Sequence, residues 1–313
     1  MKVNYIVYLN PYYKPIVGGG EYINRHFIET ATKFGIDIRI GYRESKLSDR
    51  IIPPKLKIHT KPDLWILCDI FNIPSHHLNF KHGFIENIIA NEIFVHWDNS
   101  FVDVCSSNAL PCNGTFNCFC NSKSKNNLIN NMYEKSLLNI FLSPLHAEII
   151  NKKFNNQHSN KSFISRPFID TTLFINSNVK RDIDYLYVGT IEEYKGYENL
   201  KNMFEHIPDK IYLIGKNGIK GKLFTKNHIK QITHKELVSY YNRAKIFIHL
   251  PKWKEPMART VCEAALCGCN LFLNENVGAQ YFNTDLSNPK FYFNAAEEVW
   301  EVILKKLTSL HAK

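Results

Sequence analysis

Two carboxylates eight positions apart carry the strongest chemical signal in the chain. Glu255 and Glu263 lie in the segment KEPMARTVCEAALCG, in which Pro256 suits the first turn of a helix that we expect to end at Gly268. The N–H groups of such a helix tip bind anions or hydroxyls, and Glu255 beside them can accept hydrogen bonds from sugar hydroxyls. Glu263 is placed to accept two neighbouring hydroxyls, such as those of a ribose. A plainer interpretation also fits the spacing, with Glu255 favouring the helix dipole and Glu263 facing solvent.

The elements that must position these residues alternate as in parallel α/β folds. In the first half, a β-prone run, a loop ending in three glycines, a helical pattern and a second strand form a βαβ unit. The second half repeats this order. The predicted elements are strands at 3–9, 36–40, 183–188, 211–214, 246–250 and 271–273 and helices at 21–34, 197–206 and 295–310. The pattern predicts two doubly wound domains, which bind ligands outside the carboxyl ends of their strands.

Composition sets the class of protein. The chain has 313 residues, of which 44% are apolar and 22% charged, as in a globular protein of two domains. It has no apolar run of about 18 residues, and its first residues read as a strand rather than a signal peptide. We therefore expect a cytoplasmic protein with reduced cysteines. The net charge of +10 suits an anionic partner such as nucleic acid, phospholipid or a phosphorylated glycan, or simply a basic surface.

Several motifs resemble those of one enzyme family. The segment 254–279 resembles the E-P-[FM]-[GA]-x-[ST]-x-x-E motif of the retaining GT-B glycosyltransferases, family four in particular. YLYVGTIEEYKGYENL (185–200) and IYLIGKNG (211–218) are similar to their Lys-Gly signature and the strand and glycine turn after it. FVHWDN (94–99) is similar to their histidine-containing strand end, and the three glycines before position 21 to their opening loop. The matches keep the family's order over nearly the whole chain.

The resemblance implies a fold and a division of labour. It implies the α/β GT-B architecture, with two Rossmann-like domains facing a central cleft. Residues 1–175 would form the acceptor-side domain, 176–294 the nucleotide-sugar-binding domain, and 295–313 a terminal amphipathic helix. Such enzymes need no catalytic metal and no cofactor besides the sugar nucleotide.

The resemblance also implies a role for each matching residue. Glu255 would contact hydroxyls of the transferred sugar, Glu263 would bind the ribose, and Lys195 would neutralise the diphosphate leaving group. His96 would lie beside the donor sugar. The remaining donor contacts would come from Gly19, Gly20, Gly189, Thr190, Gly215, Arg259 and Thr260.

One position departs from the family's pattern. The family usually has arginine directly after the glycine of the Lys-Gly motif, where this chain has Thr190. Arg259 or Lys216 would have to supply the missing phosphate cation. The departure keeps a non-catalytic nucleotide-sugar-binding protein as an alternative. Should the enzyme invert rather than retain, Asp98 is the candidate general base.

A loop with four cysteines is a separate feature. Cys105, Cys112, Cys118 and Cys120 lie within sixteen residues and could hold a structural zinc ion. Their spacing is not that of a zinc finger, so unpaired or packed thiols are the preferred interpretation and zinc is the alternative.

The acceptor depends on the loops of the first half. We predict transfer from a UDP- or GDP-linked sugar to a hydroxyl of an envelope glycan or lipid-linked intermediate, with peripheral contact at the inner membrane face. The acceptor would meet residues 10–17, 43–62 and 99–125. The alternative acceptor is a hydroxymethylated base in duplex DNA, as in phage genome-modifying glycosyltransferases, and it would have to be flipped out of the duplex. The sequence does not indicate the oligomeric state.

Overall fold

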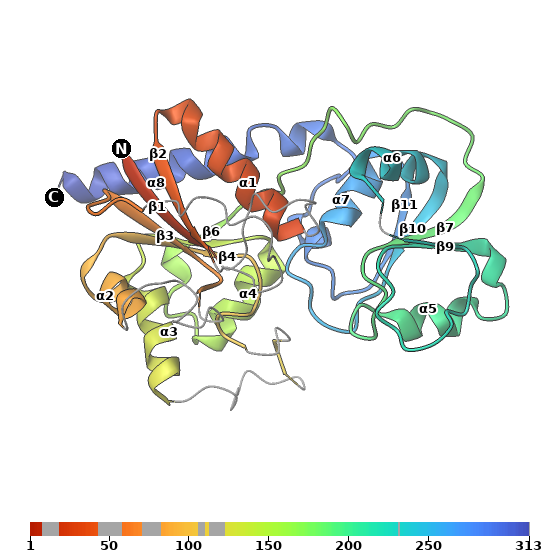
Figure 1. Ribbon diagram of the computed structural model, residues 1–313, viewed down its shortest axis with the longest axis horizontal. Coiled ribbons are helices and arrows are strands. Elements are labelled where there is room, and N and C mark those ends of the chain that lie inside the picture. Colours follow the sequence, from red (N-terminus) through yellow and green to blue (C-terminus); the bar gives the residue numbers. More distant parts are fainter. Residues whose placement is uncertain are drawn as a thin grey trace, which may run out of the picture. The chain divides into compact units, whose positions relative to one another are not determined.

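The protein consists of two compact units (Figure 1). The computed structural model describes residues 1–7, 19–42, 58–70, 83–105, 110–112, 123–230 and 232–312. The first unit comprises Met1–Leu142, Ala147–Phe168 and Asn294–Lys313, and the second comprises Ser143–His146 and Ile169–Phe293. The terminal helix therefore belongs to the first unit, although it follows the second in the sequence.

A parallel sheet of six strands forms the centre of the first unit. The strands are β1 (Lys2–Val7), β2 (Asp37–Tyr42), β3 (Leu64–Cys68), β4 (Phe94–Asp98), β5 (Asn139–Phe141) and β6 (Ser162–Ile164). They lie in the order β2-β1-β3-β4-β5-β6. Strands β3 and β4 are buried along their whole length, as expected for strands covered on both faces.

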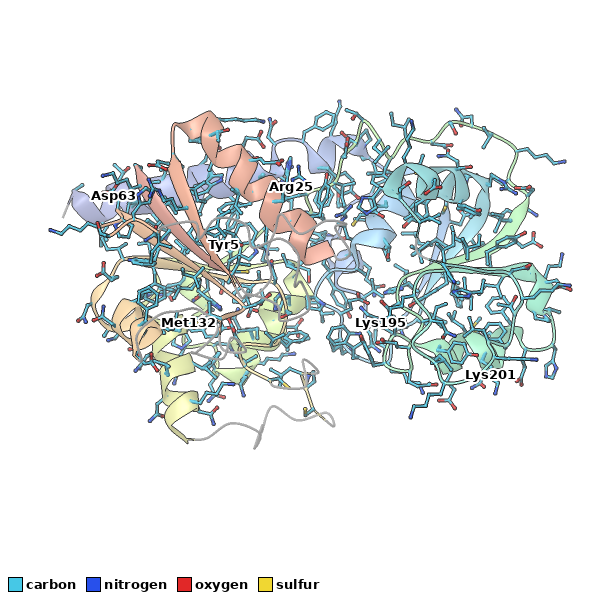
Figure 2. All side chains as sticks on the ribbon, viewed as in Figure 1. Tyr5, Arg25, Asp63, Met132, Lys195 and Lys201 are labelled. Carbon is cyan, nitrogen blue, oxygen red and sulfur yellow. The ribbon has the colours of Figure 1, made fainter. Side chains whose placement is uncertain are left out.

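Helices of the first unit pack around this sheet, and Tyr5 and Met132 lie inside the unit (Figure 2). The helices are α1 (Gly19–Ala31), α2 (Phe84–Asn91), α3 (Lys123–Lys135), α4 (Pro144–Lys153) and α8 (Ala295–His311), with short 3-10 turns at η1 (Thr32–Phe34) and η4 (Ser159–Lys161). The rings of Phe27 on α1 and Trp300 on α8 stack with centroids 4.3 Å apart. The Trp300 indole N–H donates to the Phe27 carbonyl over 2.9 Å, so the last helix is fixed to the first.

The second unit is built on a parallel sheet of five strands. The strands are β7 (Ile183–Val188), β8 (Ile211–Ile214), β9 (His228–Ile229), β10 (Ala244–His249) and β11 (Asn270–Leu273). The helices are α5 (Tyr197–Phe204), α6 (His234–Arg243) and α7 (Arg259–Leu266), with 3-10 turns at η5 (Pro208–Lys210), η6 (Gly278–Phe282) and η7 (Pro289–Tyr292). The capping box of α6 is readable in the sequence T-x-x-E, since Thr233 and Glu236 cap each other's backbone N–H groups.

Strand order locates the place where each sheet binds ligands. In the second unit the order β11-β10-β7-β8-β9 reverses direction between β7 and β10. In the first unit the reversal falls between β1 and β3. Ligands of such sheets bind outside the carboxyl ends of the strands at this switch point. The loops that follow β7 and β10 are therefore the first place to look for a site in the second unit.

Most predicted elements are confirmed, including the strands at 183–188 and 211–214 and the doubly wound α/β fold class. No helix among the described residues combines the length and apolar character that crossing a membrane requires.

Candidate functional site

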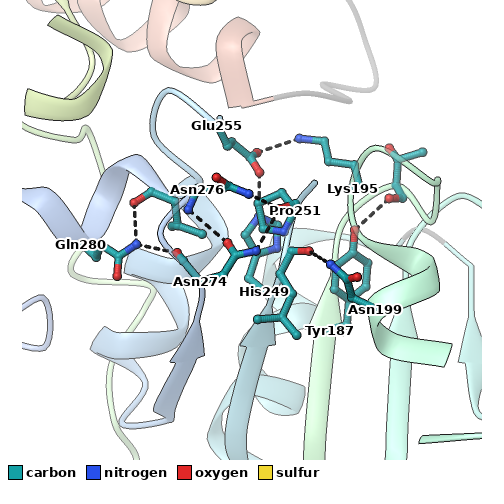
Figure 3. A network of polar contacts seen from close by, with 12 residues as sticks. Tyr187, Lys195, Asn199, His249, Pro251, Glu255, Asn274, Asn276 and Gln280 are labelled. Atoms are coloured by element: carbon teal, nitrogen blue, oxygen red, sulfur yellow. Dashed lines mark hydrogen bonds and ion pairs between the residues drawn. The ribbon is translucent and has the colours of Figure 1, made fainter. Parts of the chain in front are cut away.

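An ion-paired network joins the two loops at the switch point of the second unit (Figure 3). Lys195 lies on the loop after β7, and Glu255 lies on the segment after β10. The Lys195 Nζ is 2.7 Å from Glu255 Oε1, and the His249 Nε2 is 2.7 Å from Glu255 Oε2. Burial opposes the charge on Glu255, but Lys195 and His249 outweigh it and hold the pKa of this carboxyl well below its usual range. The site therefore keeps a charged carboxylate beside a lysine.

The chain around His249 is held by side-chain amides (Figure 3). The Asn199 amide donates to the Leu250 carbonyl over 3.0 Å. The amides of Asn274 and Asn276 donate to the Pro251 carbonyl over 2.9 and 2.8 Å. These bonds satisfy carbonyls beyond the end of β10, where the strand ladder no longer pairs them. The backbone that follows His249 is thereby fixed from two directions.

Glu255 is held by its own backbone as well. Its N–H donates to the Asn276 carbonyl over 2.7 Å, and its carbonyl accepts from the Gly278 N–H over 2.9 Å. A Cβ at Gly278 would lie 2.1 Å from the Pro256 carbonyl oxygen, so only glycine permits this approach. The GA pair at 278–279 thus belongs to the structure that presents Glu255.

The predicted helix start at Pro256 is wrong. Helix α7 begins at Arg259, and Ala258 before it adopts a left-handed φ of 65°. The reason is that Glu255 forms a parallel β-bridge with Val277, which keeps its backbone extended. Glu255 therefore stands on an extended segment rather than at the tip of the helix.

Two glycines bring the ends of β7 and β8 into backbone contact. The Gly189 N–H donates to the Ile214 carbonyl over 2.9 Å. Gly215 has a φ of 144°, and a Cβ there would lie 2.0 Å from the Gly189 carbonyl oxygen. Side chains are thus excluded from this edge, where Thr190 and the exposed Lys216 follow the glycines. Such a bare backbone edge suits a diphosphate.

Aromatic rings surround the Lys195 ammonium. Its Nζ lies 4.9 Å from the centroid of Trp253 and 5.9 Å from that of Tyr194. The two rings meet edge to face with centroids 5.6 Å apart. Cation–π attraction from these faces adds to the ion pair with Glu255 and keeps the ammonium at the switch point.

Helix α7 holds the second carboxylate of the motif in its interior. Glu263 is 1% exposed, and its Oε1 lies 2.6 Å from the guanidinium Nη2 of Arg259, one turn earlier. The Tyr241 hydroxyl donates to the other oxygen of Glu263 over 3.1 Å. The alternative in which Glu263 faces solvent is therefore wrong. Arg259 is 8% exposed, whereas Thr260 is partly exposed in the first turn.

In the first unit, buried acidic residues gather at the ends of β3 and β4. His96 is fully buried, and its Nε2 lies 3.2 Å from Asp103 Oδ2. Asp98 is fully buried as well and accepts a short hydrogen bond from the Tyr133 hydroxyl. Burial and the charge of Asp103 raise the pKa of Asp69 to about 8, and burial with both other carboxyls also raises the pKa of Asp98. The partners of the three carboxyls include the His96 ring for Asp103, the Tyr133 hydroxyl for Asp98, and the Asn99 N–H and Ser100 hydroxyl for Asp69.

The family is decided by the second unit. Residues 169–305 match the family model "Glycosyl transferases group 1". Over these residues the chain is similar to the group 1 glycosyltransferases. The predicted recognition as a family-four enzyme with the GT-B fold is thereby confirmed, and the protein is a nucleotide-sugar glycosyltransferase. Sequence comparison with curated proteins gives no significant match.

Solved structures show the same fold. Sucrose-phosphate synthase of Thermosynechococcus elongatus has a TM-score of 0.62 at 14% identity, over 100% of this chain and 98% of that one. HepE of Anabaena in complex with UDP has a TM-score of 0.57 at 14% identity, over 98% and 92%. An alpha-glucosyltransferase in complex with UDP-glucose and DNA containing an abasic site has a TM-score of 0.55 at 12% identity, over 96% and 90%.

Most of the predicted donor residues lie on the segments that follow β7, β8 and β10, including helix α7. They are Gly189, Thr190, Lys195, Gly215, Glu255, Arg259, Thr260 and Glu263. Gly19 and Gly20 begin α1 in the first unit, near its own switch point, and His96 lies on β4. The individual roles of these residues stay predictions.

Other predictions fall partly outside the described residues. The expected acceptor loops lie largely outside them: all of 10–17, most of 43–62 and much of 99–125. Cys118 and Cys120 also lie outside the described residues. The Sγ atoms of Cys105 and Cys112 are 3.9 Å apart. Within the described part of the chain, no three His, Cys, Asp or Glu side chains are arranged to hold a metal ion. A zinc ion bound by all four cysteines stays a prediction.

Three residues that contact the predicted site residues were not predicted from the sequence: His249, Trp253 and Asp103. His249 is the last residue of β10, and the rule that ligands meet the carboxyl ends of strands could have found it. Trp253 and Asp103 lie in irregular segments whose contacts depend on the folded chain.

Proposed function

We propose that the second unit binds a nucleoside diphosphate sugar at the β7–β10 switch point, with Lys195 at the diphosphate and Glu255 at the sugar. The observation that carries this proposal is the pairing of Lys195 with a charged, half-enclosed Glu255. A lysine beside a diphosphate offsets the negative charge that develops when the glycosidic bond breaks. A carboxylate that stays ionised accepts hydrogen bonds from sugar hydroxyls.

The reaction then needs no carboxylate nucleophile. The bond between the sugar C1 and the diphosphate oxygen breaks, and a new bond forms between C1 and the acceptor oxygen on the same face. The proton of the acceptor hydroxyl passes to the departing diphosphate oxygen. Lys195, the backbone edge at Gly189 and Gly215, and the first turn of α7 at Thr260 stabilise the leaving group.

The ribose role of Glu263 requires a local rearrangement, because both of its oxygens already have partners in Arg259 and Tyr241. We propose that Arg259 turns toward the diphosphate, replacing the arginine that the family has where this chain has Thr190, and so frees one oxygen for the ribose. The test compares binding of UDP and 2′-deoxy-UDP, or of the guanosine pair if that base is preferred. The wild type should prefer the ribose form and Glu263→Gln should not. Equal discrimination by both proteins would remove Glu263 from ribose recognition.

For the acceptor, we propose a hydroxyl of an envelope glycan or lipid-linked intermediate, reached from the cytoplasmic side at the inner membrane face. The net charge of +10 supports an anionic surface or substrate.

The second candidate acceptor is a hydroxymethylated base in duplex DNA. It is favoured by the likeness to an alpha-glucosyltransferase that was solved with DNA. The basic charge fits this partner as well, and DNA binding by charge would weaken steeply with salt.

One experiment separates the two acceptors. Release of the nucleoside diphosphate is measured across a panel of UDP- and GDP-sugars, with and without duplex DNA containing 5-hydroxymethylcytosine. Slow release indifferent to DNA supports the glycan acceptor, and release stimulated only by that DNA supports the second candidate. Binding of sugar nucleotides without turnover on any acceptor would contradict both and leave a binding protein.

A further inference from the structure

We infer that His249 is a positioning residue, which holds Glu255 in place while Lys195 moves from Glu255 to the diphosphate of the donor. This inference rests on the proposed donor site and deepens it. It divides the two partners of Glu255 into a fixed one and a mobile one.

The two oxygens of Glu255 explain why such a division is needed. Oε1 faces Lys195 and Oε2 faces His249, both at 2.7 Å. Each oxygen has a second lone pair, but an oxygen held by an ammonium is a weaker acceptor for a sugar hydroxyl, and a lysine bound to a carboxylate has less attraction for a diphosphate. We therefore expect one pairing to change when the donor binds.

His249 has the features of the fixed partner. Its side chain is 3% exposed and sits at the end of a strand whose continuation is held by three asparagine amides. Its ring lies nearly parallel to those of Tyr187 and Phe247, at 18° and 21°, with centroids 5.9 and 6.3 Å apart. A buried ring with two aromatic neighbours cannot swing away without disturbing the core around it.

Lys195 has the features of the mobile partner. Its side chain is 20% exposed, and its stem is long and flexible. The faces of Trp253 and Tyr194 attract the ammonium independently of Glu255. The ammonium can therefore exchange the carboxylate for a phosphate without leaving its surroundings.

The movement of Lys195 links binding of the diphosphate to binding of the sugar. Arrival of the diphosphate draws Lys195 away, frees Oε1 of Glu255 for a sugar hydroxyl, and leaves His249 as the group that fixes the carboxylate. His249 then matters for the sugar but not for the nucleoside diphosphate alone. This difference separates a positioning role from a general structural one.

The test uses two substitutions in the full-length protein. His249→Phe keeps an aromatic ring in the stack and removes the N–H donor, and His249→Gln places an amide N–H near the position of Nε2. Binding of the nucleoside diphosphate without sugar is measured by calorimetry, and kcat/KM is measured for the preferred sugar nucleotide. Thermal unfolding of both variants serves as the control that they are folded.

We expect His249→Phe to bind the nucleoside diphosphate within about twofold of the wild type. Its kcat/KM should fall about 10- to 100-fold, because a displacement of about 1 Å at a reacting centre has a cost of that order. His249→Gln should regain most of the lost rate. Wild-type kcat/KM in His249→Phe, or an equal loss of binding for the nucleoside diphosphate, would overturn the inference.

Glu255→Gln, measured alongside, separates this inference from the proposed function. If Glu255→Gln also turns over at the wild-type rate, the proposed role of Glu255 fails together with that of His249. If Glu255→Gln loses turnover and His249→Phe does not, the proposed function stands and only the role of His249 is wrong.

Discussion

Carboxylates lie at the carboxyl edge of both sheets, yet their surroundings are opposite. In the second unit, Glu255 lies between Lys195 and His249, and its pKa is held well below the usual range. In the first unit, Asp69, Asp98 and Asp103 are neighbours of one another, and burial with Asp103 raises the pKa of Asp69 to about 8. Glu255 is thus held in its charged form, whereas Asp69 is mostly protonated at neutral pH.

The two groups of carboxylates, Glu255 in the second unit and the three aspartates in the first, suit different purposes. A buried carboxylate that keeps its charge needs cations nearby. In such a site a cation can move from the carboxylate to an anionic group of the ligand. A protonated carboxyl that is hydrogen-bonded to its neighbours fixes local structure instead. Asp69 accepts from the Asn99 N–H and the Ser100 hydroxyl, and so shapes the turn after β4.

Neutralising Glu255 should have the largest effect on turnover. In Glu255→Gln, turnover should fall about 100- to 1,000-fold, because the sugar loses a charged acceptor and Lys195 loses its partner. The matched control is Asp184→Asn, which neutralises a carboxylate that likewise lies between two basic side chains, here Lys245 and Lys210 at 2.6 and 2.9 Å. Asp184 stands near the start of β7, at the opposite end of that strand from the site. Steady-state rates of the control should equal the wild type, and equal rates in Glu255→Gln would contradict the proposed site.

Adding a methyl group at Gly215 should have the next largest effect. The new Cβ would meet the Gly189 carbonyl at 2.0 Å, in addition to the strain of a φ of 144°. We expect Gly215→Ala to lower the free energy of unfolding by about 2–4 kcal/mol and to weaken nucleoside diphosphate binding.

The control for this substitution is Gly221→Ala. Gly221 also has a positive φ, 104°, but a Cβ there meets no atom within 4 Å. It should cost about 1 kcal/mol from strain alone and leave binding intact, as measured by urea unfolding and calorimetry. Equal losses in both variants would mean that the contact between Gly189 and Gly215 is unimportant.

The smallest effect concerns the first unit and the pH dependence of its stability. Asp69 has a pKa of about 8 in the folded protein and an ordinary value of 3.8, so the folded state holds a proton that the unfolded state has lost between these values. Its contribution to stability is complete below pH 3.8 and is lost as the pH rises to about 8. Asp69→Asn should remove this loss, so its free energy of unfolding relative to the wild type should rise with pH between pH 5 and 8. Urea unfolding across that range measures it, and a constant difference between the two proteins would contradict the shift.

Glu255 should show the opposite sign. Its folded pKa lies below the ordinary value of 4.5, so its contribution is present above that value and is lost as the pH falls below it.

The sequence was sufficient for the fold, and it supplied the residues of the proposed site as predictions. Continuous apolar runs predicted β7 and β8 with correct bounds, and motif resemblance identified Lys195, Glu255 and the two glycines. The start of α7 could not be predicted, because a β-bridge to Val277, far along the chain, holds Glu255 extended. The pairing of Glu263 with Arg259 depends on burial, which helical spacing alone does not decide. His249 was missed because a histidine at a strand end has many roles, and its stacking between Tyr187 and Phe247 appears only in the folded sheet.

The most direct test of whether Lys195 binds the diphosphate is calorimetric titration of UDP and GDP into the wild type, Lys195→Ala and Lys245→Ala. Both lysines pair with a carboxylate, but Lys245 lies near the amino end of β10. We expect the wild type to bind one of the nucleotides and Lys245→Ala to bind it equally well. Lys195→Ala should weaken this binding about 10- to 100-fold through loss of a charge-assisted hydrogen bond. Undiminished binding by Lys195→Ala would contradict the placement of the diphosphate at the β7–β10 switch point.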